Sequence, residues 1–283
     1  MAHRAILAGV SLGRGVPVAV MGALNVSPES FHAGSVHTST DDLLGAALAM
    51  VDAGAALIDV GARSTAPYGV STCSEQDECL RLARAVEALA AKVPVPISAD
   101  TARPGPARAA LDAGARVIND VSGLRDPEVA ALVRQRGAGA ILMASPGESA
   151  SGSGPVASVK ALLKESLERA RAAGIPDEHL VLDPGIGFFR NEAVAWDEWD
   201  AAVLAGLGEL ESLGRPICVG VSRKSFLGAI MGRPRTEDRL AGSLAATAVA
   251  VWNGAALVRA HDVAETLDAV RIAERIRRAS GTL

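Results

Sequence analysis

Three polar residues, Asp100, Asn119 and Asp183, each lie at the end of a short apolar run rich in Val, Ile and Leu. A carboxylate can accept two parallel N–H bonds, and an asparagine amide can both donate and accept. Such a set suits a flat heterocycle with a 2-amino-4-oxo edge, as in guanine or pterin. Taken singly, each residue also allows a structural interpretation, because charged groups near a core are often paired with one another.

A second group of residues is suited to an anion. Arg259 and His261 end the last apolar run, and Asn25 ends the first. Arginine and histidine bind phosphate-type groups, and the asparagine side-chain carbonyl can ligate Mg²⁺. Lys224, in the segment that begins with Ser222, follows another run and can bind either the heterocycle or the anion. The sequence therefore predicts an anion pocket beside a heterocycle pocket.

These residues are brought together only if the apolar runs are strands of one sheet. Eight runs read as buried strands, at 17–25, 57–62, 96–101, 117–123, 140–145, 180–185, 217–222 and 256–262. Stretches with helical periodicity lie between most of them, at 41–53, 75–92, 106–113, 127–136, 159–173 and 239–253. Alternation of this kind indicates a parallel sheet with right-handed crossovers.

Eight strand–helix units predict the fold class α/β, as a single (β/α)8 TIM barrel, with an open doubly wound sheet as the competing arrangement. We expect one domain over residues 1–283, with its core at about 17–276. In a barrel the carboxyl ends of all the strands meet at one mouth, where ligands bind. Segments 34–39, 66–74 and 145–153 are predicted loops at that mouth.

Composition restricts the class of protein. The chain has 283 residues, 49% hydrophobic and 21% charged, and a net charge of -4, so neither nucleic acid nor an anionic membrane is an expected partner. Its three cysteines form no C-x-x-C pair, which favours free thiols in a reducing compartment. No signal peptide or transmembrane run is apparent, so a cytoplasmic location is expected.

At these positions the chain resembles dihydropteroate synthase. The resemblance extends from about Val18 to about Arg275 and rests on seven segments in barrel order. They are 21–31 (MGALNVSPESF), 54–61 (GAALIDVG), 96–101 (PISADT), 113–123 (AGARVINDVSG), 182–188 (LDPGIGF), 220–228 (GVSRKSFLG) and 258–263 (VRAHDV). That family joins a dihydropterin pyrophosphate to p-aminobenzoate and releases pyrophosphate.

The resemblance implies a pterin site and a barrel fold. Asp100, Asn119, Asp183 and Lys224 would hold the pterin, and Phe188 is a further substrate-binding residue. Lys224 is also expected to be catalytic, together with the two cationic residues of the anion pocket. The chemistry needs no strong protein nucleophile, because the pterin can delocalise the cation that develops as pyrophosphate leaves.

The resemblance also implies the remaining partners of the reaction. Arg259 and His261 would bind the pyrophosphate and act as catalytic groups, and Asn25 would bind substrate and the cofactor Mg²⁺. Ser222 would lie near the carboxylate of the aromatic acid, and Thr65 is a further substrate-binding residue. The family also implies a homodimer; the Ala-rich helix predicted at 240–251 is one surface that would permit close packing.

Three loops depart from the family pattern, all on the acceptor side. Arg63 and Ala66 stand where the family has glutamate and arginine, and 143–147 (MASPG) replaces M-H-M-Q-G. Phe189 and Arg190 replace glycine and lysine, and the phenyl ring is expected to fill space that an aromatic acceptor uses. Arg63 is a candidate to restore the charge lost at position 66.

Three enzymatic readings follow from these departures. In the first, the chain is an ordinary synthase. In the second, it is a paralogue that uses a different aromatic amine or lacks synthase activity. In the third, it is a methyltransferase that passes a methyl group from a pterin to a corrinoid protein. The intact 222–224 turn and the Arg259 and His261 pair argue against the methyltransferase, because a methyl donor has no pyrophosphate to hold. A non-enzymatic pterin-binding protein requires that the altered loops abolish turnover.

Overall fold

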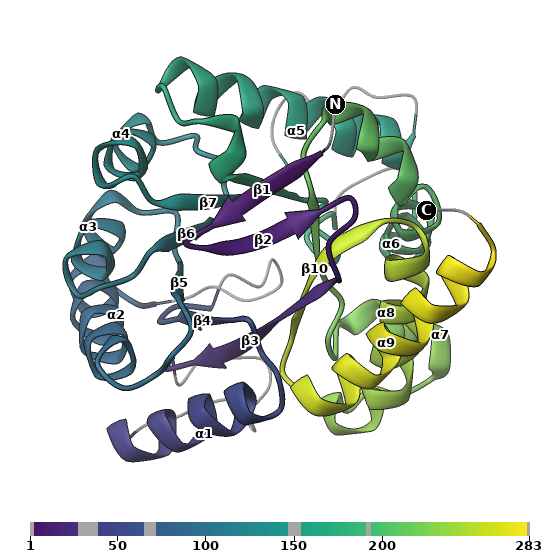
Figure 1. Cartoon of the computed structure of the whole chain (residues 1–283), viewed down its shortest axis with the longest axis horizontal. Helices are drawn as coiled ribbons and strands as arrows, with labels where there is room; N and C mark the ends of the chain where they lie inside the picture. Colours follow the sequence, from purple (N-terminus) through teal and green to yellow (C-terminus); the bar gives the residue numbers. More distant parts are fainter. Residues whose placement is uncertain (1–2, 28–38, 65–71, 147–153, 191–193, 282–283) are drawn as a thin grey trace.

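The computed structural model describes residues 3–27, 39–64, 72–146, 154–190 and 194–281. Eight parallel strands close a barrel in the order β10-β3-β4-β5-β6-β7-β8-β9, and helices surround it (Figure 1). The strands are β3 Ala19–Asn25, β4 Leu57–Gly61, β5 Ile97–Asp100, β6 Val117–Asp120, β7 Gly139–Met143, β8 Leu180–Asp183, β9 Ile217–Gly220 and β10 Ala255–Ala260. The predicted (β/α)8 barrel is confirmed, and the open sheet is excluded because β10 pairs with both β9 and β3.

The helices that cover the barrel begin and end where local signals place them. Asp126 caps α4 by accepting the Glu128 N–H, Pro127 follows as its first residue, and Gly137 ends it with a left-handed backbone. The helices are α1 Thr40–Asp52, α2 Glu75–Ala90, α3 Pro104–Asp112, α4 Pro127–Arg136, α5 Pro155–Ala172, α6 Trp196–Ala205, α7 Ser225–Met231, α8 Leu240–Trp252 and α9 Val263–Ala279. Most parts of the loops predicted at 34–39, 66–74 and 145–153 fall outside the described residues.

A two-stranded antiparallel hairpin before the barrel was not predicted. It consists of β1 Arg4–Leu7 and β2 Val10–Gly13, joined at Ala8 and Gly9, both with positive φ (49° and 94°). Its buried side chains pack against inward-facing barrel residues from the amino-terminal half of the strands, namely Met21, Leu57, Val117, Ile141, Val181, Cys218 and Leu257. The hairpin therefore closes the end of the barrel opposite the mouth.

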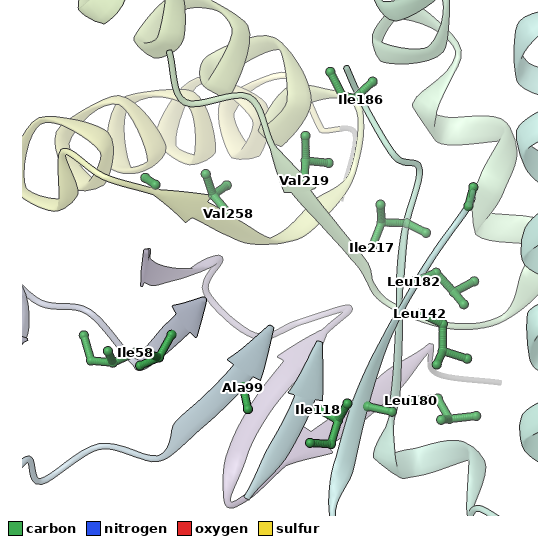
Figure 2. Packing of buried hydrophobic residues seen from close by; sticks show 14 of the residues in the cluster. Ile58, Ala99, Ile118, Leu142, Leu180, Leu182, Ile186, Ile217, Val219 and Val258 are labelled. Carbon is green, nitrogen blue, oxygen red and sulfur yellow. The ribbon is translucent and has the colours of Figure 1, made fainter. Parts of the chain in front are cut away.

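The period-two alternation of each strand decides which side chains enter the barrel. One set faces the helices and belongs to the outer hydrophobic core, several of them shown in Figure 2: Ile58, Ala99, Ile118, Leu142, Leu182, Val219 and Val258. The residue after each of them points to the other side of its strand. Those next residues include Asp59, Asp100, Asn119, Asp183 and Arg259. The apolar outer set thus places a polar layer inside the barrel.

Candidate active site

An arginine on β10 lies at the centre of the polar layer. Arg259 Nε donates to Asp59 Oδ2 at 2.6 Å, and its Nη2 donates to Asp100 Oδ2 at 3.2 Å. Asn119 Nδ2 donates to the same Asp59 oxygen at 3.2 Å. Four strands, β4, β5, β6 and β10, therefore contribute to one network, although Asp59 and Arg259 are 200 residues apart in the chain.

Asp59, which joins this network together, was not among the predicted site residues. It lies inside β4 rather than at its end, and it is completely buried. The signal that could have revealed it is a lone carboxylate in the apolar stretch Leu57–Gly61, since an unpaired buried charge is costly. Asp59 holds both Arg259 and Asn119, so it orients groups from two other strands.

Burial and charge shift the protonation of the network. Burial raises the pKa of Asp100 to about 7, with Arg259 opposing the rise and Asp59 adding to it. Burial alone lowers the pKa of Arg259, but the carboxylates of Asp59 and Asp100 leave it above its ordinary value. Within the described part of the chain, Asp59 Oδ1 and Asp100 Oδ1 are buried without a hydrogen-bond partner. Two carboxylate oxygens thus remain to accept bonds from a ligand.

The raised pKa of Asp100 predicts a pH dependence of stability. Between about pH 4 and 7, Asp100 keeps its proton in the folded state. In the unfolded chain, where the pKa of Asp100 has its ordinary value of 3.8, this proton is already released. This contribution to the unfolding free energy is fully present below about pH 4 and is lost as the pH rises through about 7. Between these limits we expect the unfolding free energy to fall by at most about 1.4 kcal/mol for each pH unit of increase. Urea unfolding of wild type and Asp100→Asn from pH 4 to 8 measures it; parallel curves would contradict the assignment.

A second cluster lies where β8 and β9 end. Asp183 Oδ1 accepts the Gly185 N–H at 2.7 Å, and Lys224 Nζ donates to the Ile186 carbonyl. The Lys224 ammonium lies 5.1 Å from the centre of the Phe188 ring. Burial raises the pKa of Asp183 and lowers that of Lys224, and each charge partly offsets the shift of the other. A carboxylate, an ammonium and an aromatic ring are therefore held together.

The segment 222–224 divides its side chains between two environments. Ser222 Oγ lies 3.0 Å from His261 Nδ1 and accepts the His261 backbone N–H at 3.2 Å, so these two predicted site residues are adjacent. Arg223, with φ of 55°, instead forms a two-pronged ion pair with Asp262 at 2.7 and 2.8 Å. Arg223 and Asp262 therefore neutralise each other and have a structural role.

Asp120, at the end of β6, also has a structural role. Its carboxylate accepts the N–H groups of Ser122 at 2.7 Å and Leu124 at 3.0 Å. Leu124 has a left-handed backbone, with φ of 58°, and the two bonds hold this tight turn. Alternation places Asn119 inside the barrel and Asp120 outside it, so only the first of these neighbours reaches the polar layer.

The region between Asn25 and Asp100 suits a magnesium ion that arrives with a phosphate ligand. A Cβ added at Gly61 would meet Asn25 Oδ1 at 3.3 Å and Asp100 Oδ2 at 3.7 Å, so the glycine keeps this space open. No group of three or more His, Cys, Asp or Glu side chains that could hold a metal occurs among the described residues. Mg²⁺ commonly takes one or two protein oxygens and completes its shell with water and substrate phosphate. The residues present are compatible with that mode, in which Asn25 would be the protein ligand.

Arg63, one of the departures from the family pattern, takes part in a buried ion pair. Its Nε lies 3.4 Å from Glu78 Oε2, to which Arg103 Nη1 also donates at 3.2 Å. Glu78 is 1% exposed and accepts the Thr101 hydroxyl at 2.6 Å. Two cations share one carboxylate, and the charge of Arg63 also acts on the polar layer, where it is one of the charges that oppose the burial-driven rise in the pKa of Asp100. Ala66 and the predicted site residue Thr65 lie outside the described residues.

The prediction that Phe189 fills acceptor space is wrong. The ring is 1% exposed and stacks on Trp199 of α6, with centroids 5.0 Å apart. It packs in the outer core because the neighbouring Gly185 and Gly187, both with positive φ, turn the chain after β8. Arg190 continues this packing, donating to Ser225 Oγ with its guanidinium 4.0 Å above the Trp196 ring.

Fold and site together define a class of protein: a barrel enzyme with carboxylates and an amide for a heterocycle, and cationic groups for an anion, in one mouth. The family model described as pterin binding enzyme matches residues 21–261. The chain is 38% identical to the dihydropteroate synthase of Escherichia coli, covering 90% of each, and 40% identical to that of Mycobacterium leprae, covering 90% of this chain and 92% of the relative. It also spans 30% of the probable bifunctional folylpolyglutamate synthase/dihydropteroate synthase of Haloferax volcanii, at 41% identity.

Solved structures show the same likeness. The Yersinia pestis dihydropteroate synthase in complex with a sulfonamide drug superposes with a TM-score of 0.87 at 36% identity, covering 98% of this chain and 99% of that one. The Xanthomonas albilineans enzyme with 4-aminobenzoic acid gives a TM-score of 0.85 at 36% identity, with the same coverage. The chain therefore belongs to the family of pterin-binding enzymes and, within it, to the dihydropteroate synthase type of transferase.

Proposed function

We propose that the chain condenses 6-hydroxymethyl-dihydropterin pyrophosphate with p-aminobenzoate, or a related aromatic amine, and releases pyrophosphate. The observation that carries this proposal is the buried layer in which Arg259 is held by Asp59 and Asp100 beside the Asp183 and Lys224 cluster. An acidic side for ring N–H groups and a cationic side for phosphate oxygens lie in the same mouth. A structure of the Xanthomonas albilineans dihydropteroate synthase in complex with 7,8-dihydropteroate supports this proposal.

The pterin ring is proposed to bind between the two clusters. The carboxylate oxygens of Asp100 and Asp183 would accept N–H groups of the ring, and the amide of Asn119 would match its mixed edge. Lys224 would donate to a ring acceptor, and Phe188 would contact the ring face. Burial strengthens each of these bonds, because the effective dielectric constant inside the barrel is low.

The pyrophosphate is proposed to bind on the β3 and β10 side of the mouth. Arg259 uses Nε and Nη2 within the protein, which leaves Nη1 to a phosphate oxygen. His261, beside Ser222, would supply a second donor, and Asn25 would hold the Mg²⁺ that accompanies the substrate. A bound Mg²⁺ neutralises part of the charge on the phosphate oxygens.

Catalysis then follows from positioning and from stabilisation of the leaving group. As the carbon–oxygen bond to the pterin methylene breaks, negative charge grows on the pyrophosphate, which Arg259 and His261 would stabilise. The ring delocalises the matching positive charge, and Lys224 fixes its orientation. The acceptor amine then attacks the methylene carbon, the new carbon–nitrogen bond replaces the carbon–oxygen bond, and the proton that the amine loses passes to the departing pyrophosphate or to water. The carboxylate of the acceptor is proposed to lie near Ser222. Holding both reactants in one mouth replaces a bimolecular encounter with a local one.

Pyrophosphate release tests the proposal. The purified protein is incubated with the pterin pyrophosphate, Mg²⁺ and p-aminobenzoate, and pyrophosphate and dihydropteroate are quantified in the same samples. The expected result is release of both in equal amounts. A panel of other aromatic amines shows which acceptor the enzyme prefers. The panel is needed because Arg63 is a cationic departure from the family pattern near the mouth. Pterin binding without turnover by any amine would overturn the synthase proposal.

We further propose that the enzyme is a homodimer formed through α7, α8 and α9, which lie side by side in Figure 1. These helices carry exposed apolar side chains at Ile230, Met231, Val249, Trp252, Ile272 and Ile276. A set of this kind on neighbouring helices is typical of an association surface. Light scattering is expected to give twice the chain mass of 28.8 kDa for wild type and a monomer for Trp252→Glu. A monomeric wild type would contradict the proposal, and Ile6→Glu, on the hairpin, is the control.

A cytoplasmic location is proposed on the state of the cysteines. Cys73, Cys79 and Cys218 are all free thiols, and Cys73 and Cys218 are buried. Free thiols are typical of a reducing compartment. Across the described ranges, none of the helices combines the length and the apolar character that crossing a membrane demands.

A further inference from the structure

One buried carboxylate next to the proposed pterin site has no part in the mechanism given above. Asp200 lies on α6, outside the barrel, and is completely buried. Its Oδ1 accepts the Gly187 N–H at 2.8 Å, and its Oδ2 is buried with no hydrogen-bond partner among the described residues. A carboxylate in such a position is costly unless nearby charge compensates it.

The compensating charge comes mainly from Lys224. Gly187 lies between the two residues, with its N–H on Asp200 and its Cα against the lysine side chain: an added Cβ would meet Lys224 Cδ at 3.0 Å. The Ile186 carbonyl, which precedes Gly187, accepts a hydrogen bond from the Lys224 ammonium. The peptide unit that joins Ile186 to Gly187 thus connects Asp200 on one side to Lys224 on the other.

The electrostatics agree with this geometry. Burial raises the pKa of Asp200 to about 6, with the Gly187 N–H, Lys224 and Arg190 opposing the rise and Asp197 adding to it. Burial lowers the pKa of Lys224, with Asp183 and then Asp200 opposing that change. Near neutral pH most of Asp200 is therefore ionised. Lys224 is flanked by two carboxylates, one inside the barrel and one behind the loop.

We propose that Asp200 is a positioning residue for the pterin site, which fixes the loop after β8 through Gly187 and serves as the second counter-ion of Lys224. The proposal rests on the proposed function, because it concerns the lysine that would bind the pterin. Asp183 faces the ligand and must exchange part of its interaction with Lys224 for bonds to the ring. Asp200 does not face the ligand, so its support for the lysine charge is the same before and after binding.

Asp200→Asn is the test, because it keeps an oxygen for the Gly187 N–H and removes only the charge. The pKa of Lys224 is measured by trace acetylation with acetic anhydride and peptide mass spectrometry, which needs no knowledge of the function. We expect this pKa to fall by about one pH unit. The alkaline limit of pterin binding should move to lower pH by the same amount. The melting temperature at pH 7.5 should be unchanged or higher, because a buried charge is gone. Glu198→Gln, exposed on the same helix, is the matched control.

The outcomes separate the two proposals. If Lys224 titrates in Asp200→Asn as in wild type, the counter-ion role of Asp200 is wrong, whatever the pterin result. If the wild type binds no pterin but the lysine pKa still falls in the variant, the proposed function and the positioning role at a pterin site fail, and the counter-ion role of Asp200 stands. If the asparagine variant does not fold, the pKa of Lys224 is measured instead in Asp200→Ser, which is smaller and also uncharged.

Discussion

Replacing Asp183 by alanine is expected to weaken pterin binding about 100-fold, as measured by fluorescence titration with the pterin pyrophosphate. Loss of a charged hydrogen-bond partner in a buried site costs about 3 kcal/mol, and each factor of ten corresponds to about 1.4 kcal/mol. The substitution also removes the acceptor of the Gly185 N–H and one counter-ion of Lys224. The ring would lose its own bond to the carboxylate and part of its bond to the lysine.

Two further variants make the Asp183 result specific. Asp183→Asn keeps an oxygen for the Gly185 N–H, so we expect it to fold as wild type and to bind the pterin with intermediate affinity. Asp177→Ala removes an exposed carboxylate that pairs with Arg171 at 2.7 Å just before β8, and it should leave binding unchanged. Unchanged affinity in Asp183→Ala would remove this carboxylate from the pterin site.

Replacing Arg259 by alanine is expected to affect both stability and ligand choice. Asp59 and Asp100 would remain buried without their cation, and breaking such a pair costs about 3–5 kcal/mol of unfolding free energy. Arg259 opposes the burial that raises the pKa of Asp100 to about 7, so its loss should raise that pKa further, and the loss of stability should be larger above about pH 7 than below it. Affinity for the pyrophosphate form should fall far more than affinity for the bare pterin. Urea unfolding at pH 7.5 and titration with both ligands measure the two effects.

The controls for Arg259 separate charge from packing. Arg271→Ala breaks an exposed pair with Asp268, and exposed pairs contribute only about 0–1 kcal/mol. The double variant Arg259→Met with Asp59→Asn removes one charge of each sign and should recover part of the lost stability. Equal losses of affinity for the two ligands would assign Arg259 to the ring, and an unfolding free energy like that of wild type would exclude the buried network.

Much of the fold and of the site could be read from the sequence, because both depend on local periodicity. Apolar runs at regular spacing predicted the eight strands, and the polar residues at six of the eight strand ends predicted the mouth. Asp100, Asn119 and Asp183 are found inside the barrel for this reason. The hairpin of Arg4–Leu7 and Val10–Gly13 was missed, since two four-residue strands carry too few residues to show a period.

Side-chain orientation set the limit of prediction at the site. Asn119 and Asp120 are adjacent and equally polar in the sequence, but alternation sends one into the barrel and the other to a turn. Phe189 differs from the family pattern in a loop next to the site, yet it packs against Trp199 in the outer core. Asp59 and Asp200 were not singled out, because neither lies at the end of a strand.

The class of fold, the family and the residue types that gather at the mouth could therefore be inferred before any coordinates, since they follow from a pattern of apolar and polar positions along the chain. Which charges are partners became known from the folded chain alone. Arg259 binds Asp59 and Asp100, and Asp200 supports Lys224 through Gly187. Such pairings depend on distances of a few ångström between strands and helices far apart in the chain, and spacing along the sequence does not carry that information.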